Sequence, residues 1–336
     1  MRTARPRCSA RPETPPARRV WTVSGTVSTM HPFRFAVTAS WATTPDAWTA
    51  QARQAERLGY SVLLMPDHLG RQLSLIAALT AAAMATTQLR VGSFVFANDY
   101  RHPLVLAREA ATVDFLSGGR FELGLGAGWN TADYAHLGQP YDPAPRRIDR
   151  LEEAIPLVKR LLSGETVDHD GPHYRMAGAR VAPPPVQRPR PPLLVGGGGP
   201  RMLRLAAREA DIVAMLPQFD ARGRPLVRQA TETATGRKVS ILREAAGRRF
   251  DELELNVIVA DAGLVGSGRP VRASLLAALK AAGAGLIGTP YVLFGTRAQL
   301  RDVLQRRRDR LGISYYAIPA HAMEAMGPLV ADLAGR

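Results

Sequence analysis

An aspartate and a histidine stand side by side after a short apolar run of the sequence. Residues 61–65 have the composition of a buried strand, and Pro66 separates them from Asp67 and His68. A carboxylate beside an imidazole suits general acid–base chemistry, because imidazole exchanges its proton near neutral pH. Spacing alone leaves a second interpretation open, in which Asp67 caps the next segment and His68 is an ordinary hydrogen-bonded loop residue.

Glycine recurs at alternate positions in a second apolar run, at Gly124, Gly126 and Gly128. Alternate glycines clear one face of a strand, so that either a flat ring approaches the backbone or crowding inside a sheet is relieved. Trp129 and Asn130 follow directly. We predict that these two side chains line a substrate pocket, although a single tryptophan also suits ordinary packing.

Four consecutive glycines, residues 196–199, precede Pro200 and a helical pattern. Main-chain N–H groups at the start of a helix favour phosphate, so this loop predicts a phosphate-binding corner. A flexible connection between a strand and a helix is the alternative, because glycine permits both arrangements.

Hydrolytic and metal-dependent chemistry are disfavoured, because the motifs that they need are missing from the sequence. The sequence has no Ser–His–Asp order, no Walker motif and no His-Glu-x-x-His spacing. Its single cysteine, Cys8, excludes a disulfide within the chain and a cysteine-held metal cluster. A phosphate loop, a cleared strand face and one acid–base pair remain, and this combination is typical of hydride transfer with a bound cofactor.

The elements that position these residues follow a regular alternation. From Phe33 onward, short apolar runs alternate with longer amphipathic ones, which predicts βαβ units. Strands are expected at residues 35–39, 61–65, 89–96, 121–125, 192–195, 211–216, 253–259 and 313–318, and helices at residues 45–58, 74–86, 103–116, 144–162 and 201–210.

Eight such strands predict an α/β fold, a (β/α)8 TIM barrel with insertions, whose active site lies at the carboxyl ends of the strands. An open doubly wound sheet is disfavoured, because no Gly-x-Gly-x-x-Gly follows the first strand. Residues 1–29 contain six arginines and one glutamate without apolar periodicity. They predict a disordered basic leader that ends at Met30, before a single domain over residues 31–336.

The net charge of +15 favours an anionic small molecule as partner. Nucleic acid is disfavoured, because the arginines are scattered and form no basic runs with interleaved aromatics. Residues 74–88, the longest nearly uncharged stretch, are too short and too polar for a membrane span. With one cysteine, the chain is expected in the reducing cytoplasm.

Several of these motifs together resemble the luciferase-like monooxygenase superfamily, and in particular its branch that uses the deazaflavin coenzyme F420. The resemblance extends from about Phe33 to the C-terminus. Its carriers are Pro66-Asp67-His68, residues 102–107, residues 110–121, the glycine-rich run 124–129, residues 195–200 and residues 311–316. The run Ser117-Gly-Gly-Arg-Phe is quite specific to this group.

The resemblance implies a bacterial-luciferase-like barrel that holds the cofactor at its mouth. Asp67 and His68 match the acidic–His pair that flanks the reactive carbon in deazaflavin enzymes, where the histidine assists proton movement during hydride transfer. The group also has a non-prolyl cis peptide at the end of the third strand, expected here at Phe94–Val95, that supports the ring from behind. The cofactor-binding residues implied are Phe94, Val95, Gly126, Gly128, Gly197, Gly198 and Gly199. A homodimer is expected from the same likeness.

Two departures from the family pattern limit what is carried over. Trp129 stands where the sugar-phosphate dehydrogenases of the group have a glutamate, so that substrate is not implied. Leu216, Pro217 and Gln218 supply neither the threonine nor the lysine that some relatives place on the phosphate. We therefore predict an F420-dependent oxidoreductase with an unidentified small organic substrate, and an FMN-dependent monooxygenase of the same fold as the alternative. The alternative that is not an enzyme is a non-catalytic protein that carries or senses the cofactor.

Overall fold

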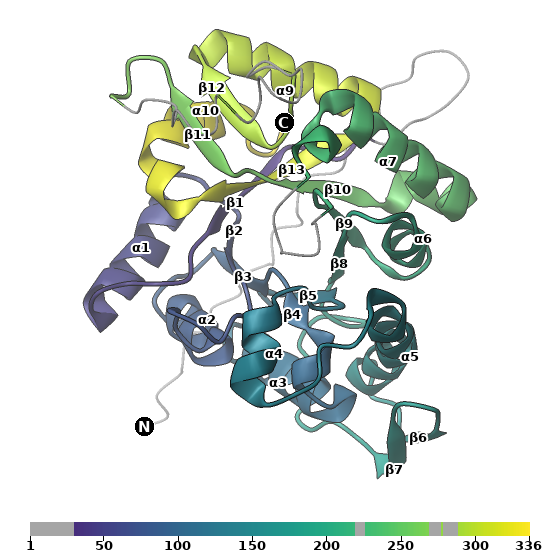
Figure 1. The fold of residues 1–336 in the computed structure, drawn as a ribbon. Coiled ribbons are helices and arrows are strands. Elements are labelled where there is room, and N and C mark those ends of the chain that lie inside the picture. The colour runs from purple at the N-terminus through teal and green to yellow at the C-terminus, as the bar shows by residue number, and fades with distance from the viewer. Residues whose placement is uncertain (1–29, 219–225, 269–276, 278–287) are drawn as a thin grey trace, which may run out of the picture.

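Eight parallel strands close into a barrel in the computed structural model, which describes residues 30–218, 226–268, 277 and 288–336 (Figure 1). The barrel strands are β1 (Arg34–Thr38), β2 (Val62–Met65), β3 (Arg90–Ser93), β5 (Phe121–Gly126), β8 (Leu193–Gly197), β9 (Ile212–Met215), β10 (Glu254–Ile258) and β13 (Ile313–Pro319). They are ordered β3-β2-β1-β13-β10-β9-β8-β5, and β3 pairs with β5 to close the ring. The two-residue β4 (Phe96–Ala97) adds to the end of β5. The predicted barrel is confirmed.

Helices surround the barrel (Figure 1). They are α1 (Pro45–Arg57), α2 (Leu75–Met84), α3 (Pro103–Leu116), α4 (Thr131–Leu137), α5 (Ala144–Leu162), α6 (Pro200–Glu209), α7 (Glu232–Ala246), α9 (Arg297–Leu311) and α10 (Met323–Leu333), with short 3-10 turns η1 (Asn98–Tyr100), η2 (Val227–Ala230), η3 (Gly247–Glu252) and η4 (Ala320–Ala322). Thr44 caps α1 and Pro45 starts it, as the sequence predicts. The leader predicted at residues 1–29 lies outside the described residues. Within the described residues, no helix is long and apolar enough to cross a membrane.

Two small sheets lie outside the barrel. An antiparallel hairpin of β6 (Val167–Asp170) and β7 (Arg175–Ala179) projects beyond α5 (Figure 1). A parallel pair is formed by β11 (Asp261–Leu264) and β12 (Val292–Gly295). The sequence predicts none of these four strands, because each has only four or five residues and no alternating pattern.

The interior of the barrel is packed with side chains. Its buried cluster comprises Ala36, Val62, Leu64, Phe94, Leu194, Ile212, Ala214, Tyr315 and Ala317. Val95 and Ile258 are partly buried and pack against this cluster from the carboxyl ends of β3 and β10. The barrel therefore has a solid apolar floor beneath its carboxyl-end mouth.

Arg120, in the motif most specific to the suspected family, anchors the start of β5. Gly118 and Gly119 have φ values of 67° and 86°, so the turn after α3 requires glycine. The Arg120 guanidinium then donates to the carbonyl oxygens of Ser117 at 2.7 Å, Leu89 at 2.6 Å and Ala83 at 2.8 Å. These bonds tie the ends of α2 and α3 to the strand that carries the glycine-rich run.

Candidate active site at the barrel mouth

A cavity of about 500 Å³ opens at the carboxyl end of the barrel. Its lining includes Phe94 after β3, Ile258 in β10 and His321 after β13. In barrels of this type the carboxyl ends of the strands carry the reactive side chains. The cavity is therefore the candidate substrate-binding site.

His68 lies at this end and takes its carboxylate partner from α4. Its Nδ1 is 2.7 Å from Oδ2 of Asp133, whose other oxygen accepts the main-chain N–H of Leu69 at 3.0 Å. Burial alone would raise the pKa of Asp133, but the hydrogen bonds from His68 and Leu69 outweigh it and the pKa lies below its usual value. An ionised Asp133 accepts a hydrogen bond from Nδ1–H of His68. Nε2 is therefore the nitrogen of His68 that is available for proton exchange.

Asp67 does not pair with His68, although the two are neighbours in sequence. Both carboxylate oxygens of Asp67 face Arg101, at 2.5 and 3.2 Å, and Oδ2 also accepts the N–H of Ala97 at 3.2 Å. Asp67 is buried and joins the end of β2 to β4 and to the chain that follows it. The predicted Asp67–His68 pair is thus replaced by a His68–Asp133 pair, while the catalytic role assigned to Asp67 stays a prediction.

Trp129 and Asn130 flank the His68–Asp133 pair. The Trp129 ring, 42 % exposed, meets the His68 ring edge to face with centroids 5.4 Å apart. Asn130 caps α4 and accepts the Ala132 N–H at 3.2 Å, which sets the first turn that carries Asp133. Sequence reasoning missed Asp133, and the available signal was an aspartate three residues after a capping asparagine.

The alternating glycines of β5 make room for protein atoms. A Cβ on Gly124 would lie 2.1 Å from the Ser93 carbonyl oxygen, and one on Gly126 would lie 2.7 Å from Cγ2 of Val95. The Phe94–Val95 peptide bond is cis, as the family resemblance predicts. Relief of crowding is therefore the interpretation that these contacts support, and Val95 occupies the cleared face of the strand. Contact of Phe94, Val95 and Gly126 with a cofactor stays a prediction.

Gly128 serves the loop that follows β5. It has a φ of 75°, and a Cβ there would lie 2.4 Å from the Tyr134 hydroxyl, which donates to Oδ2 of Asp99 at 2.9 Å. The guanidinium of Arg147 donates to the carbonyl oxygens of Ala127, at 3.1 Å, and of Gly128. Helix α5 thereby holds the backbone just before Trp129 in place.

The glycines in the loop before α6 have different surroundings. A Cβ on Gly197 would lie 2.6 Å from Cβ of Met202, and one on Gly198 would lie 2.3 Å from the Leu216 carbonyl oxygen, so both permit close packing. Gly199 is the N-cap of α6, has no side-chain cap, and would place a Cβ no closer than 3.7 Å to Gln218. The helix start at Gly199 therefore offers room and N–H groups to an anion.

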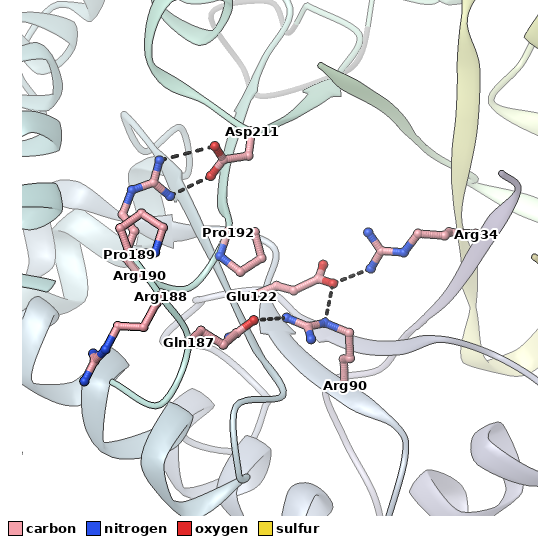
Figure 2. A pocket seen from close by; sticks show the side chains of 9 residues that line it. All are labelled: Arg34, Arg90, Glu122, Gln187, Arg188, Pro189, Arg190, Pro192 and Asp211. Atoms are coloured by element: carbon pink, nitrogen blue, oxygen red, sulfur yellow. Dashed lines mark hydrogen bonds and ion pairs between the residues drawn. The ribbon is translucent and has the colours of Figure 1, made fainter. Parts of the chain in front are cut away.

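A second cavity, of about 620 Å³, lies at the amino ends of the strands (Figure 2). Arg34 and Arg90 point toward Glu122, and Arg190 faces Asp211 with contacts of 2.6 and 3.2 Å. Each of these three arginines thus has a carboxylate partner. The cavity is on the face of the barrel that serves stability, and we place no chemistry there.

A closed barrel with a histidine–carboxylate pair and an uncapped helix start at its carboxyl end places the chain in the class of TIM-barrel proteins, in which that end usually carries the active site. The sequence profile of the luciferase-like monooxygenase family matches residues 26–250. The chain therefore belongs to this family, whose members are oxidoreductases and monooxygenases. The predicted superfamily is confirmed.

Solved structures share this fold at low sequence identity. The coenzyme F420-dependent tetrahydromethanopterin reductase from Methanopyrus kandleri is 19 % identical, with 90 % of this chain and 99 % of that chain covered and a TM-score of 0.71. An F420-dependent secondary alcohol dehydrogenase in complex with an F420–acetone adduct is 16 % identical over 89 % and 99 %, with a TM-score of 0.68. A riboflavin lyase with modified FMN and riboflavin is 15 % identical over 90 % and 92 %, with a TM-score of 0.70. These likenesses show the fold and leave the cofactor unassigned.

Proposed function

We propose that this protein is an F420-dependent oxidoreductase that transfers hydride between the cofactor and a small organic substrate. The observation that carries the proposal is the His68–Asp133 pair at the mouth of a luciferase-family barrel. The resemblance to deazaflavin enzymes rests on the same histidine, and two F420-dependent enzymes share the fold. The cytoplasmic location and the homodimer stay predictions.

The residues at the mouth fit a ring with a phosphate-bearing tail. Phe94 and Val95 form an apolar floor for the ring, and the N–H groups at the start of α6 suit the phosphate. When bound, the cofactor supplies the hydride donor or acceptor. In the protein, Asp133 orients His68 and keeps its Nδ1 protonated, so that Nε2 holds or releases the proton that accompanies hydride transfer.

An FMN-dependent monooxygenase is the second candidate. Two observations favour it: no basic side chain follows β9 at Leu216, Pro217 or Gln218, and the riboflavin lyase with modified FMN shares the fold. The two candidates use the same barrel mouth, so they differ in which ring and tail the protein binds.

Binding of each cofactor to the purified full-length chain separates the candidates. Titrations with F420 and with FMN, followed by fluorescence, are expected to give at least ~10-fold tighter binding of F420. Tight FMN binding without F420 binding would overturn the choice of cofactor. Failure of both to bind would favour a protein without either cofactor.

Two variants at Gly199 test whether the phosphate lies at α6. Gly199→Asp fits the open space and caps the helix, yet its negative charge opposes a phosphate, whereas Gly199→Asn is of equal size and neutral. We expect G199D to weaken binding of the preferred cofactor by ~10-fold or more relative to G199N, without loss of thermal stability. Equal affinities of the two variants would place the phosphate elsewhere.

A further inference from the structure

We propose that Lys238 is a positioning residue for the cofactor phosphate, and that its buried ammonium group supplies the positive charge that the chain directly after β9 lacks. The inference rests on the proposed function, because it concerns the phosphate-binding corner formed by residues 196–199 and the start of α6. Lys238 belongs to α7 and does not line the mouth cavity. It therefore acts on the corner from behind, through the main chain that separates the two.

Lys238 is a buried cation whose partners are all neutral in the part of the chain that the structure describes. The residue is 3 % exposed, and its Nζ donates to the main-chain oxygens of Leu216 at 2.7 Å and Gln229 at 3.1 Å. The third partner is the Tyr291 hydroxyl at 3.2 Å. A buried charge without an opposite charge costs free energy of folding, and an apolar residue of similar length would avoid this cost. The charge of Lys238 therefore points to a role other than stability.

A single carbonyl group separates this ammonium group from the glycine loop. A Cβ on Gly198 would lie 2.3 Å from the same Leu216 oxygen that accepts from Lys238. The N–H of Leu216 donates to the Gly197 carbonyl oxygen at 3.0 Å, and the Gln218 amide donates to the Gly198 carbonyl oxygen at 3.3 Å. Lys238 therefore fixes the end of β9 against the loop that presents its N–H groups to a phosphate.

The charge of Lys238 changes what an anion meets at this corner. The Leu216 oxygen that touches Gly198 is the negative end of a carbonyl dipole, which by itself opposes an anion nearby. The ammonium group on that oxygen more than offsets the dipole, because it carries a full positive charge. Burial lowers the pKa of Lys238 to about 8, so the charged form predominates at neutral pH. Charges interact more strongly in the protein interior than in water, so a phosphate at the start of α6 is attracted across the intervening carbonyl.

Binding of inorganic phosphate to the full-length protein tests the proposal without a cofactor ring. Phosphate is titrated at neutral pH and low ionic strength, and the main-chain N–H resonance of Gly199 is followed by NMR. We expect a saturable shift in the wild type and ~5-fold or weaker binding in Lys238→Met. Lys238→Gln keeps a donor for the Leu216 oxygen without the charge, so it should weaken binding to a similar extent. Restored binding in K238Q, wild-type affinity in K238M, or no saturable response of the wild type overturns the proposal.

Lys159→Met is the matched control for net charge. Nζ of Lys159 lies 2.9 Å from the carboxylate of Glu209, at the opposite end of α6, so K159M removes the same charge far from the corner and should leave phosphate binding unchanged. Equal weakening in K159M and K238M would contradict the proposal. Thermal unfolding shows that each variant is folded, and K238Q remains informative where K238M is unstable. Loss of F420 binding with intact phosphate binding would refute the proposed function alone, whereas wild-type phosphate affinity in the Lys238 variants would refute the role of Lys238 alone.

Discussion

The hydrogen bond from His68 to Asp133 decides which ring nitrogen of the histidine carries a proton. Asp133 is ionised at neutral pH, because hydrogen bonds to its charged form outweigh the cost of burial and lower its pKa. The carboxylate therefore stabilises the Nδ1–H tautomer. The Trp129 ring contacts the imidazole edge to face and restricts its rotation.

Asp133→Asn should release this preference. An amide carries no charge and can donate as well as accept, so the Nε2–H tautomer of His68 gains population, and turnover falls by about 100-fold. Heteronuclear NMR of the histidine side chains measures the tautomer without a substrate. Asp67→Asn is the matched control: it removes the bidentate partner of Arg101 and should lower stability while leaving the His68 tautomer unchanged. A tautomer change in D67N alone would restore Asp67 as the partner.

At the scale of elements, β5 and the chain after β3 form one packed unit. Gly126 approaches Val95 so closely that a single added methyl group would lie 2.7 Å from Cγ2 of Val95. Val95 also packs on the buried cluster inside the barrel. The floor of the mouth thus depends on a small residue in one strand facing a branched residue after another.

Gly126→Ala should therefore destabilise the protein by about 1–3 kcal/mol through overpacking. Combining it with Val95→Ala removes the methyl groups that clash. The double variant is therefore expected to lose less stability than the two single variants together, by about 1 kcal/mol or more. Urea denaturation measures all three. Gly70→Ala is the control, because a Cβ at Gly70 meets nothing within 4 Å. Additive effects, or a G126A as stable as G70A, would contradict the packing argument.

The strands and helices of the barrel could be predicted because their signals are local. Thr44 and Pro45 mark the start of α1, Gly118 and Gly119 mark a turn, and the β-branched runs between such points give the barrel strands. The partner of His68 could not be predicted in this way. It depends on how α4, a helix of seven residues, packs against the mouth, and 65 positions separate His68 from Asp133. The strand pair β11–β12, whose Asp261 contacts His321, has four residues in each strand and no alternating pattern.

On the scale of the whole molecule, charge is divided between the two ends of the barrel. At the amino end, Arg34 and Arg90 both contact Glu122, Arg90 at 2.8 Å (Figure 2). Arg34 also contacts Glu254. At the carboxyl end, the described lining of the mouth cavity has no lysine or arginine. The large net positive charge of the chain is therefore not concentrated where substrate is expected, and it does not define the substrate.

The amino-end network gives the stability of the protein a specific pH dependence. Burial raises the pKa of Glu254 to about 7, against the opposing effect of Arg34, 2.5 Å away. The pKa of Glu122 shifts in the opposite direction. Burial would raise it, but the positive charges of Arg34 and Arg90 outweigh burial and lower it. Because burial and the nearby negative charge of Glu122 both disfavour a second ionised carboxylate, Glu254 is the one that remains unfavourable when ionised.

A group with a raised pKa in the folded state binds protons more tightly than in the unfolded chain, so its contribution to stability is complete below the unfolded value of about 4.5 and is lost as the pH rises through about 7. Glu254→Gln removes this loss. Relative to the wild type, E254Q should gain about 2–3 kcal/mol in the free energy of unfolding between about pH 5 and about pH 8. Urea denaturation at both pH values measures the gain, with Asp170→Asn in the exposed pair with Arg175 as the control that should show almost none. A gain of the opposite sign would mean that Arg34 stabilises ionised Glu254 more than burial disfavours it.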